Sequence, residues 1–179
     1  MFYLLVLAVA VSRLLPHPPN VACVAALGLF AGCYLQGRRA YLVPMAVMLC
    51  SDLAGHLLGI PGLGFYSPIA FALVYVGLLA SVPVGRMLAN SNSKSTLWHY
   101  PAASVVATSL FFVISNFGVW LAGWYPLTTG GLTACYVNAI PFYGLSAAGD
   151  LFFTVALFGT WELSRRWNHS SVLQGHLAR

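Results

Sequence analysis

Charged residues are scarce in this chain of 179 residues. They make up 6% of the sequence, whereas an average soluble domain carries about 25%. Only three residues are acidic, against eight Lys and Arg. So few charges cannot form a water-facing surface, so we expect lipid to surround most of the chain. The net charge of +5 does not indicate nucleic-acid binding, because the basic residues lie between apolar runs rather than along one stripe.

Several functional signatures are also missing. The four cysteines show no CxxC spacing, so neither a disulfide framework nor a thiolate metal site is expected. The sequence contains no GxSxG, HExxH, GxGxxG or phosphate-loop motif. Without a phosphate loop the chain cannot hydrolyse ATP by that route alone, so any energised transport would require a partner. No motif identifies a cofactor.

Long apolar runs dominate what remains. The chain is 60% hydrophobic with a mean hydropathy of +0.83, and a spanning helix needs roughly 20 mostly apolar residues. We therefore expect an all-α, polytopic membrane helix bundle as residues 1–161, with a cytoplasmic tail at 162–179. The six expected transmembrane helices are 2–15, 21–35, 41–58, 69–89, 102–124 and 138–161. The first two are short for a full span.

The basic residues predict how the bundle is oriented. Cytoplasmic loops carry an excess of Lys and Arg, and with six spans all basic residues except Arg13 fall on one face. Both termini would then be cytoplasmic, in a multi-pass protein of a bacterial inner membrane. The loops 59–68 and 125–136 would lie together on the outer face.

A proline-rich elbow, residues 13–20, separates the first two apolar runs. Pro16, Pro18 and Pro19 prevent a helix from crossing it, so it ends one helix and starts another. No small-residue cleavage site precedes Arg13, so we expect a retained helix rather than a signal peptide. In the six-span topology this elbow joins the outer loops.

Ionisable residues inside a span are functional candidates by default. Asp52 and His56 share one face of the third run, and Asp150 lies mid-way along the sixth. We expect the rare polar residues to converge on one outward-facing pocket. Its expected substrate-binding residues are Arg13, His17, Asn20, Asp52, His56, Asn116, Tyr125 and Asp150.

Alternatives remain open for several of these residues. Asp52 could instead tie helices together by pairing with Arg13, because buried charges are retained for structure as well as function. Asp150 could have a structural hydrogen-bonding role. His17, His56 and Asp52 could form a three-ligand metal set, although nothing in the spacing fixes the third ligand. Gly28 and Gly32 form a GxxxG pair that favours close helix packing within the chain over partner docking.

Two resemblances add to this interpretation. The chain resembles an uncharacterised family of small bacterial inner-membrane proteins, a domain of unknown function. The segments that carry this resemblance are RLLPHPPN at 13–20, AALGLFAG at 25–32, Ser51-Asp52, NFGVW at 116–120 and GDL at 149–151. Small residues in the early helices, Arg38-Arg39 and the SDLAG segment at 51–55 make the chain more weakly similar to the substrate-binding S components of energy-coupling factor transporters. That resemblance implies a pocket for a vitamin or metal, and a shared membrane and ATPase module as partner.

The expected function is therefore binding or uptake of a small molecule, with the lipid bilayer, the ligand and an energising module as partners. The alternative is a membrane-embedded enzyme, or a metal- or cofactor-binding subunit, that uses His17, His56 and Asp52. A third reading is an assembly subunit of a larger complex.

Overall fold

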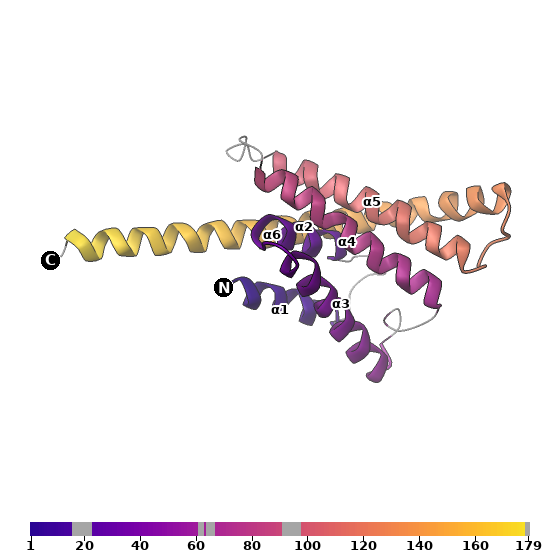
Figure 1. Ribbon diagram of the computed structural model, residues 1–179, viewed down its shortest axis with the longest axis horizontal. Helices are drawn as coiled ribbons and strands as arrows, with labels where there is room; N and C mark the ends of the chain where they lie inside the picture. The colour runs from indigo at the N-terminus through magenta and orange to yellow at the C-terminus, as the bar shows by residue number, and fades with distance from the viewer. Residues whose placement is uncertain (16–22, 61–62, 64–66, 91–97, 178–179) are drawn as a thin grey trace.

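The structure is a computed structural model that describes residues 1–15, 23–60, 63, 67–90 and 98–177, with side chains up to residue 167. Within these residues the chain forms helices and no strand, as expected (Figure 1). The helices of the described residues are α1 (Phe2–Ser12), α2 (Val24–Tyr34), α3 (Arg39–Leu57), α4 (Pro68–Asn90), α5 (His99–Leu121) and α6 (Thr129–Leu177).

Four of these helices, α3 to α6, are long and apolar enough to cross a membrane. The expectation of six spans is wrong for the first two runs. Helices α1 and α2 have 11 residues each, or about 16 Å, roughly half of a ~30 Å hydrocarbon core. Helix α2 stops at Tyr34 because Leu35 is extended and Gly37 has a φ of 58°.

Helix α2 is the centre of the bundle. It packs against α3, α4, α5 and α6, and Figure 1 shows it among the longer helices. Every residue from Val24 to Gly32 is buried. A helix that is apolar on all sides suits only such a position, so this short element forms the core around which the four longer helices pack.

Three glycines bring α2 and α4 into backbone contact. A Cβ atom at Gly28 would lie 2.7 Å from a main-chain oxygen of α4. A Cβ atom at Gly32 would overlap the carbonyl oxygen of Val82, and one at Gly85 would overlap that of Leu29. The GxxxG pair therefore packs within the chain, in agreement with the favoured interpretation.

Helix α6 begins earlier than expected and includes most of the predicted 125–136 loop. Thr128 caps it, because the N–H of Gly131 donates to Thr128 Oγ1 at 3.1 Å, the standard N-cap geometry. The glycine pair 130–131 therefore lies in a first helical turn. The helix continues through residue 161 without a break, and its C-terminal part extends beyond the other helices (Figure 1).

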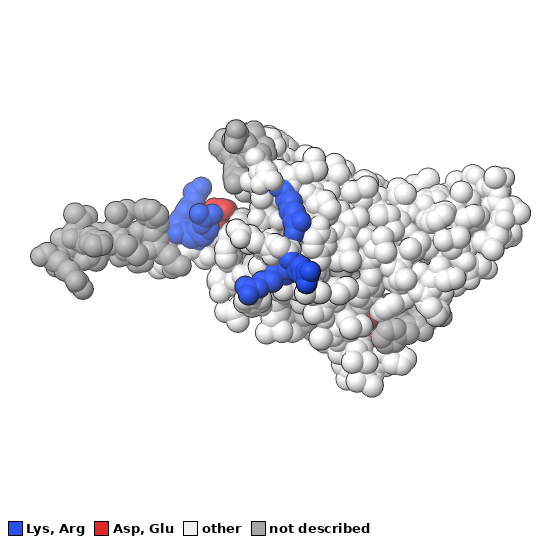
Figure 2. Space-filling model, viewed as in Figure 1, with Lys and Arg blue, Asp and Glu red and all other residues white. Residues whose placement is uncertain are grey.

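The two ends of the bundle differ in charge. At one end α2 and α4 finish and α3 and α5 begin, and both chain termini lie toward that end (Figure 1). Figure 2 shows Arg side chains gathered there. Arg86 ties this end together, since its Nη2 donates to Gly37 O at 2.7 Å and its guanidinium lies 4.8 Å from the centre of the Tyr41 ring. We refer to this end of the bundle as the arginine end.

The close α2–α4 approach predicts opposite effects for two glycine substitutions. Gly32→Ala should lower the free energy of unfolding by about 1–3 kcal/mol, because the new methyl overlaps the α4 backbone. Gly159→Ala is the matched control, since no neighbouring atom lies within 4 Å of its Cβ position, and it should raise stability by about 0.5–1 kcal/mol. Unfolding in mixed micelles measures both, and equal effects would contradict the packing described here.

Candidate functional site

A buried ion pair joins α1 to α3. Arg13 Nη2 lies 2.6 Å from Asp52 Oδ1, and the two side chains are 10% and 8% exposed. The hydroxyl of Tyr75, on α4, donates to Asp52 Oδ2 at 2.9 Å. Both carboxylate oxygens are therefore satisfied, and three helices meet at one polar cluster, which we call the Arg13–Asp52–Tyr75 cluster.

Helix geometry favours a cation at the position of Arg13. It follows the last turn of α1, where the helix carbonyls carry a partial negative charge that favours a cation. Its partner Asp52 lies about 20 Å along α3 from Arg39, in the half of α3 away from the arginine end. The second terminal nitrogen, Nη1, contacts the sulfur of Met48, which is only a weak hydrogen-bond acceptor.

Asp150 caps the start of α2 from another helix. The first N–H groups of a helix have no partner within the helix, and α2 has no side-chain cap of its own. The N–H of Ala26 donates to Asp150 Oδ1 at 3.0 Å, and Thr108 Oγ1 of α5 donates to Oδ2 at 2.8 Å. With 2% exposure, Asp150 fixes the α2 start inside the bundle.

A second polar bridge accompanies this cap. Thr154, one turn further along α6, donates to the hydroxyl of Ser104 on α5 at 3.1 Å, and both residues are buried. Sequence reasoning missed these hydroxyl residues and Tyr75. The sequence signal that could have identified them is a hydroxyl side chain inside an otherwise apolar run.

Asn116 and Tyr125, two further expected site residues, form their hydrogen bonds outside these clusters. Asn116 donates to Phe112 O of its own helix at 2.8 Å. Tyr125 lies between α5 and α6, where its hydroxyl is 3.4 Å from Asn138 Nδ2. His56 is exposed near the end of α3. The structure thus brings Arg13 and Asp52 together and places Asp150 in a separate cluster.

His17 and Asn20 lie outside the described residues, so the structure does not place two of the expected ligand-binding side chains. The metal set of His17, His56 and Asp52 includes one of them. Within the part of the chain that the structure describes, no group of three or more His, Cys, Asp or Glu residues could hold a metal ion.

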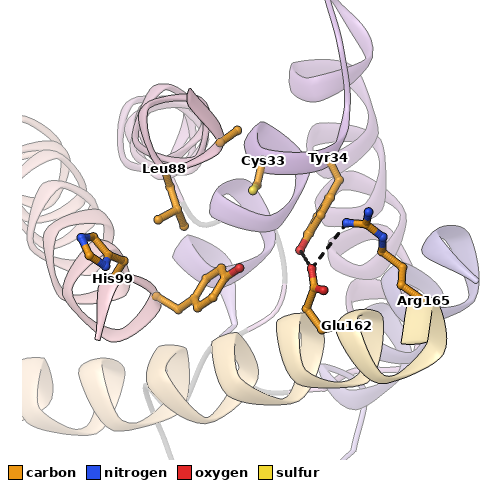
Figure 3. Close-up of a pocket in the computed structure, with 8 residues that line it drawn as sticks. Cys33, Tyr34, Leu88, His99, Glu162 and Arg165 are labelled. Atoms are coloured by element: carbon orange, nitrogen blue, oxygen red, sulfur yellow. Dashed lines mark hydrogen bonds and ion pairs between the residues drawn. The ribbon is translucent and has the colours of Figure 1, made fainter. Parts of the chain in front are cut away.

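A pocket of about 200 Å³ lies at the arginine end (Figure 3). The ends of α2, α4 and α5 and the middle of α6 form its walls. Glu162 accepts a hydrogen bond from the Tyr34 hydroxyl at 3.2 Å and lies 3.7 Å from Arg165. The spacing of Glu162 and Arg165 predicts their pairing, but nothing in the sequence indicates the pocket. Its lining residues are Cys33, Tyr34, Leu88, Ala89, His99, Tyr100, Glu162 and Arg165.

Comparison with known proteins identifies the family. Residues 1–172 match a family of unknown function, DUF6580, and the chain belongs to it. This confirms the resemblance to an uncharacterised family. No curated protein and no solved structure matches the chain.

The buried ion pair predicts a non-additive pattern of stability. Arg13→Met alone should cost about 3–5 kcal/mol, because it leaves the Asp52 carboxylate buried and without its charged partner. Combining it with Asp52→Leu should restore most of that loss. Unfolding titrations of the single and double variants measure the coupling, and Tyr75→Phe, which removes one hydroxyl, serves as the mild control at about 1 kcal/mol. Additive losses would contradict a close pair.

The Asp150 cap predicts a clear difference between two substitutions. Asp150→Asn should be tolerated, because an amide oxygen can still accept from Ala26 N–H while the amide nitrogen donates to Thr108. Asp150→Leu should destabilise by about 1–3 kcal/mol, since it leaves a buried backbone donor unsatisfied. Melting temperatures of the two variants in one detergent provide the comparison. A similar loss for both would mean that charge, rather than capping, matters.

Proposed function

We propose that this member of the DUF6580 family is a multi-pass membrane protein that binds a small polar molecule for uptake. The ligand is vitamin-like or a metal species and carries an anionic or carbonyl group. It enters from the face opposite the arginine end. The observation that carries the proposal is the Arg13–Asp52–Tyr75 cluster, a charged group buried at the end of a half-length helix.

Arg13 is suited to hold such a group. A guanidinium has five N–H donors in a fixed fork that matches carboxylate and phosphate oxygens. Among the described residues, one terminal nitrogen is bound by Asp52, while the other contacts only the sulfur of Met48. A ligand oxygen is a far better acceptor than a thioether, so a ligand that displaces Met48 gains a charge-assisted hydrogen bond.

The half-length helices support the same function. Transporters place substrate sites where discontinuous helices end inside the bundle, because the helix ends supply partial charges for binding. Here α1 ends at Arg13, and α2 begins at the Asp150 cap. Asp52 would then accept a hydrogen bond from a donor group of the ligand. Tyr75, which donates to the same carboxylate, would move with Asp52 if the ligand displaced it.

The arginine end would face the cytoplasm of a bacterial inner membrane, by the excess of basic residues there. A reporter fused after Gly130 should then be found outside the cytoplasm. An uptake role like that of a transporter S component requires an energising module in the membrane. Since Gly28 and Gly32 pack against α4, a docking surface for that module would use lipid-facing side chains of other elements.

Ligand screening tests the proposed binding directly. The purified chain should show a raised melting temperature with one class of a panel of vitamins, organic anions and metal salts, because a ligand that binds only the folded state stabilises it. At a ligand concentration 100 times its Kd the stabilisation should be about 2.7 kcal/mol. Differential scanning fluorimetry in detergent measures the shift.

Tyr75→Phe gives the matched control for this experiment. This variant keeps the ring and the Arg13–Asp52 pair but removes the hydrogen bond to Asp52. It should therefore fold, and its affinity for the ligand should differ from that of the unaltered chain. Gly159→Ala, remote from the cluster, should bind as the unaltered chain does. A panel without any shift, with Asp52→Asn leaving growth on scarce nutrients unchanged, would refute the proposal.

A further inference from the structure

The pocket at the arginine end is separate from the Arg13–Asp52–Tyr75 cluster, and its walls come from four helices. Figure 3 shows Cys33 and Tyr34 on α2 and Leu88 on α4, facing His99 on α5 and Glu162 on α6. One side is apolar, and the other carries a carboxylate. Its volume of about 200 Å³ admits a small polar group and excludes a large ligand.

Glu162 is unusual among the three acidic residues of the chain. Asp52 and Asp150 are buried and bound on both oxygens, whereas the Glu162 side chain is 39% exposed. Among the described residues, its contacts with Tyr34 and Arg165 both engage Oε1. Its second oxygen is therefore available to a cation in the pocket.

Aromatic residues line the pocket that this carboxylate faces. Tyr34 and Tyr100 line the pocket, and the Trp161 ring packs 5.0 Å from that of Tyr34. Ring faces attract an ammonium group within about 6 Å of their centres. A carboxylate beside such rings recognises an organic ammonium better than it recognises a hydrated metal ion, which requires several oxygen ligands.

The surroundings place the pocket at the level of lipid headgroups. Trp98 and Trp167 are 78% and 79% exposed near it, and Trp is enriched at the membrane interface. The basic residues gather at the same end of the bundle as the pocket, and Arg165 is among its lining residues. Cations at this level attract phosphate, while Leu88 and Ala89 offer an apolar side to a hydrocarbon chain.

We propose that this pocket binds the headgroup of an amine-bearing phospholipid from the leaflet at the arginine end. The ammonium group pairs with Glu162 and contacts the rings of Tyr34 and Tyr100. The phosphate lies toward Arg165. The chemistry recognised is a phosphate and an ammonium group joined by a short linker, and the proposal is independent of the uptake function.

The opposed charges distinguish this occupant from an anionic lipid. A headgroup such as glycerol phosphate would draw Arg165 away from Glu162, and would leave that carboxylate without a cation while removing water from it. Desolvating an unpaired carboxylate is unfavourable. The pocket should therefore select phosphatidylethanolamine over phosphatidylglycerol, although the arginine end as a whole is basic.

Native mass spectrometry of the full chain tests the selection. Delipidated protein is mixed with phosphatidylethanolamine or phosphatidylglycerol of identical acyl chains, and the bound fraction is compared. We expect about a tenfold preference for the amine lipid, the size of one charge-assisted hydrogen bond. Glu162→Gln should abolish the preference, because it removes the partner of the ammonium group and also the carboxylate that disfavours phosphatidylglycerol. Equal binding of both lipids to the unaltered chain would overturn the proposal, as would a preference that survives Glu162→Gln.

Two further variants keep the test specific. Leu163→Ala, next to Glu162 but 69% exposed, is the control and should retain the preference. Tyr100→Leu removes one ring and should weaken amine-lipid binding several-fold, which provides a second measurement if Glu162→Gln unfolds. Soluble phosphoethanolamine is the remaining comparison. If it binds as tightly as the lipid, the site belongs to a free zwitterion and the assignment to a membrane lipid is wrong.

Discussion

The structure depends on the satisfaction of one helix start inside an apolar bundle. Helix α2 begins where no water can bond its first N–H groups, and each unsatisfied group there would cost several kcal/mol. The carboxylate of Asp150 supplies the missing acceptor, and Thr108 holds it in place. Because α2 packs against all four longer helices, its position determines how they meet. One side chain of α6 thus supports the centre of the fold.

The three acidic residues have three different environments. Asp150 binds a helix end, Asp52 binds a guanidinium, and Glu162 faces the pocket at the arginine end. The first two join elements that lie far apart in the sequence, while the third retains exposure. In a chain with few charges, two carboxylates are each paired with an arginine and a tyrosine hydroxyl, whereas the third accepts from a helix N–H and a threonine hydroxyl. This distribution separates a structural centre from two candidate binding sites.

Hydrophobicity and charge were sufficient to predict the coarse architecture. The runs that became α3, α4 and α5 were identified nearly to their ends, because long apolar stretches bounded by Pro, Gly and polar residues leave few choices. The position of the basic residues at one end also followed from the sequence. The start of α6 was missed because Gly130 and Gly131 indicated a loop, whereas the side chain of Thr128 caps a helix there.

The candidate site was less accessible to sequence reasoning. The partner of Asp150 is a backbone N–H of α2. Because every residue except proline has a backbone N–H, no residue type in the sequence predicts this contact. Tyr75 and Thr108 are single hydroxyls on other helices, and their role depends on how those helices are rotated. The pocket at the arginine end forms only where four helix segments meet. Such features require the three-dimensional arrangement, whereas Arg13 and Asp52, as rare charges, were identifiable from composition.

Helix α6 has a mechanical consequence for the molecule. It continues without interruption from the cap at Asp150 to Glu162, about 18 Å further along its axis, and then beyond the other helices (Figure 1). A continuous α-helix resists stretching, so an axial displacement of its projecting segment would move both carboxylates together. A load applied to the projecting segment would thus act on the start of the central helix and on the pocket at the arginine end at the same time.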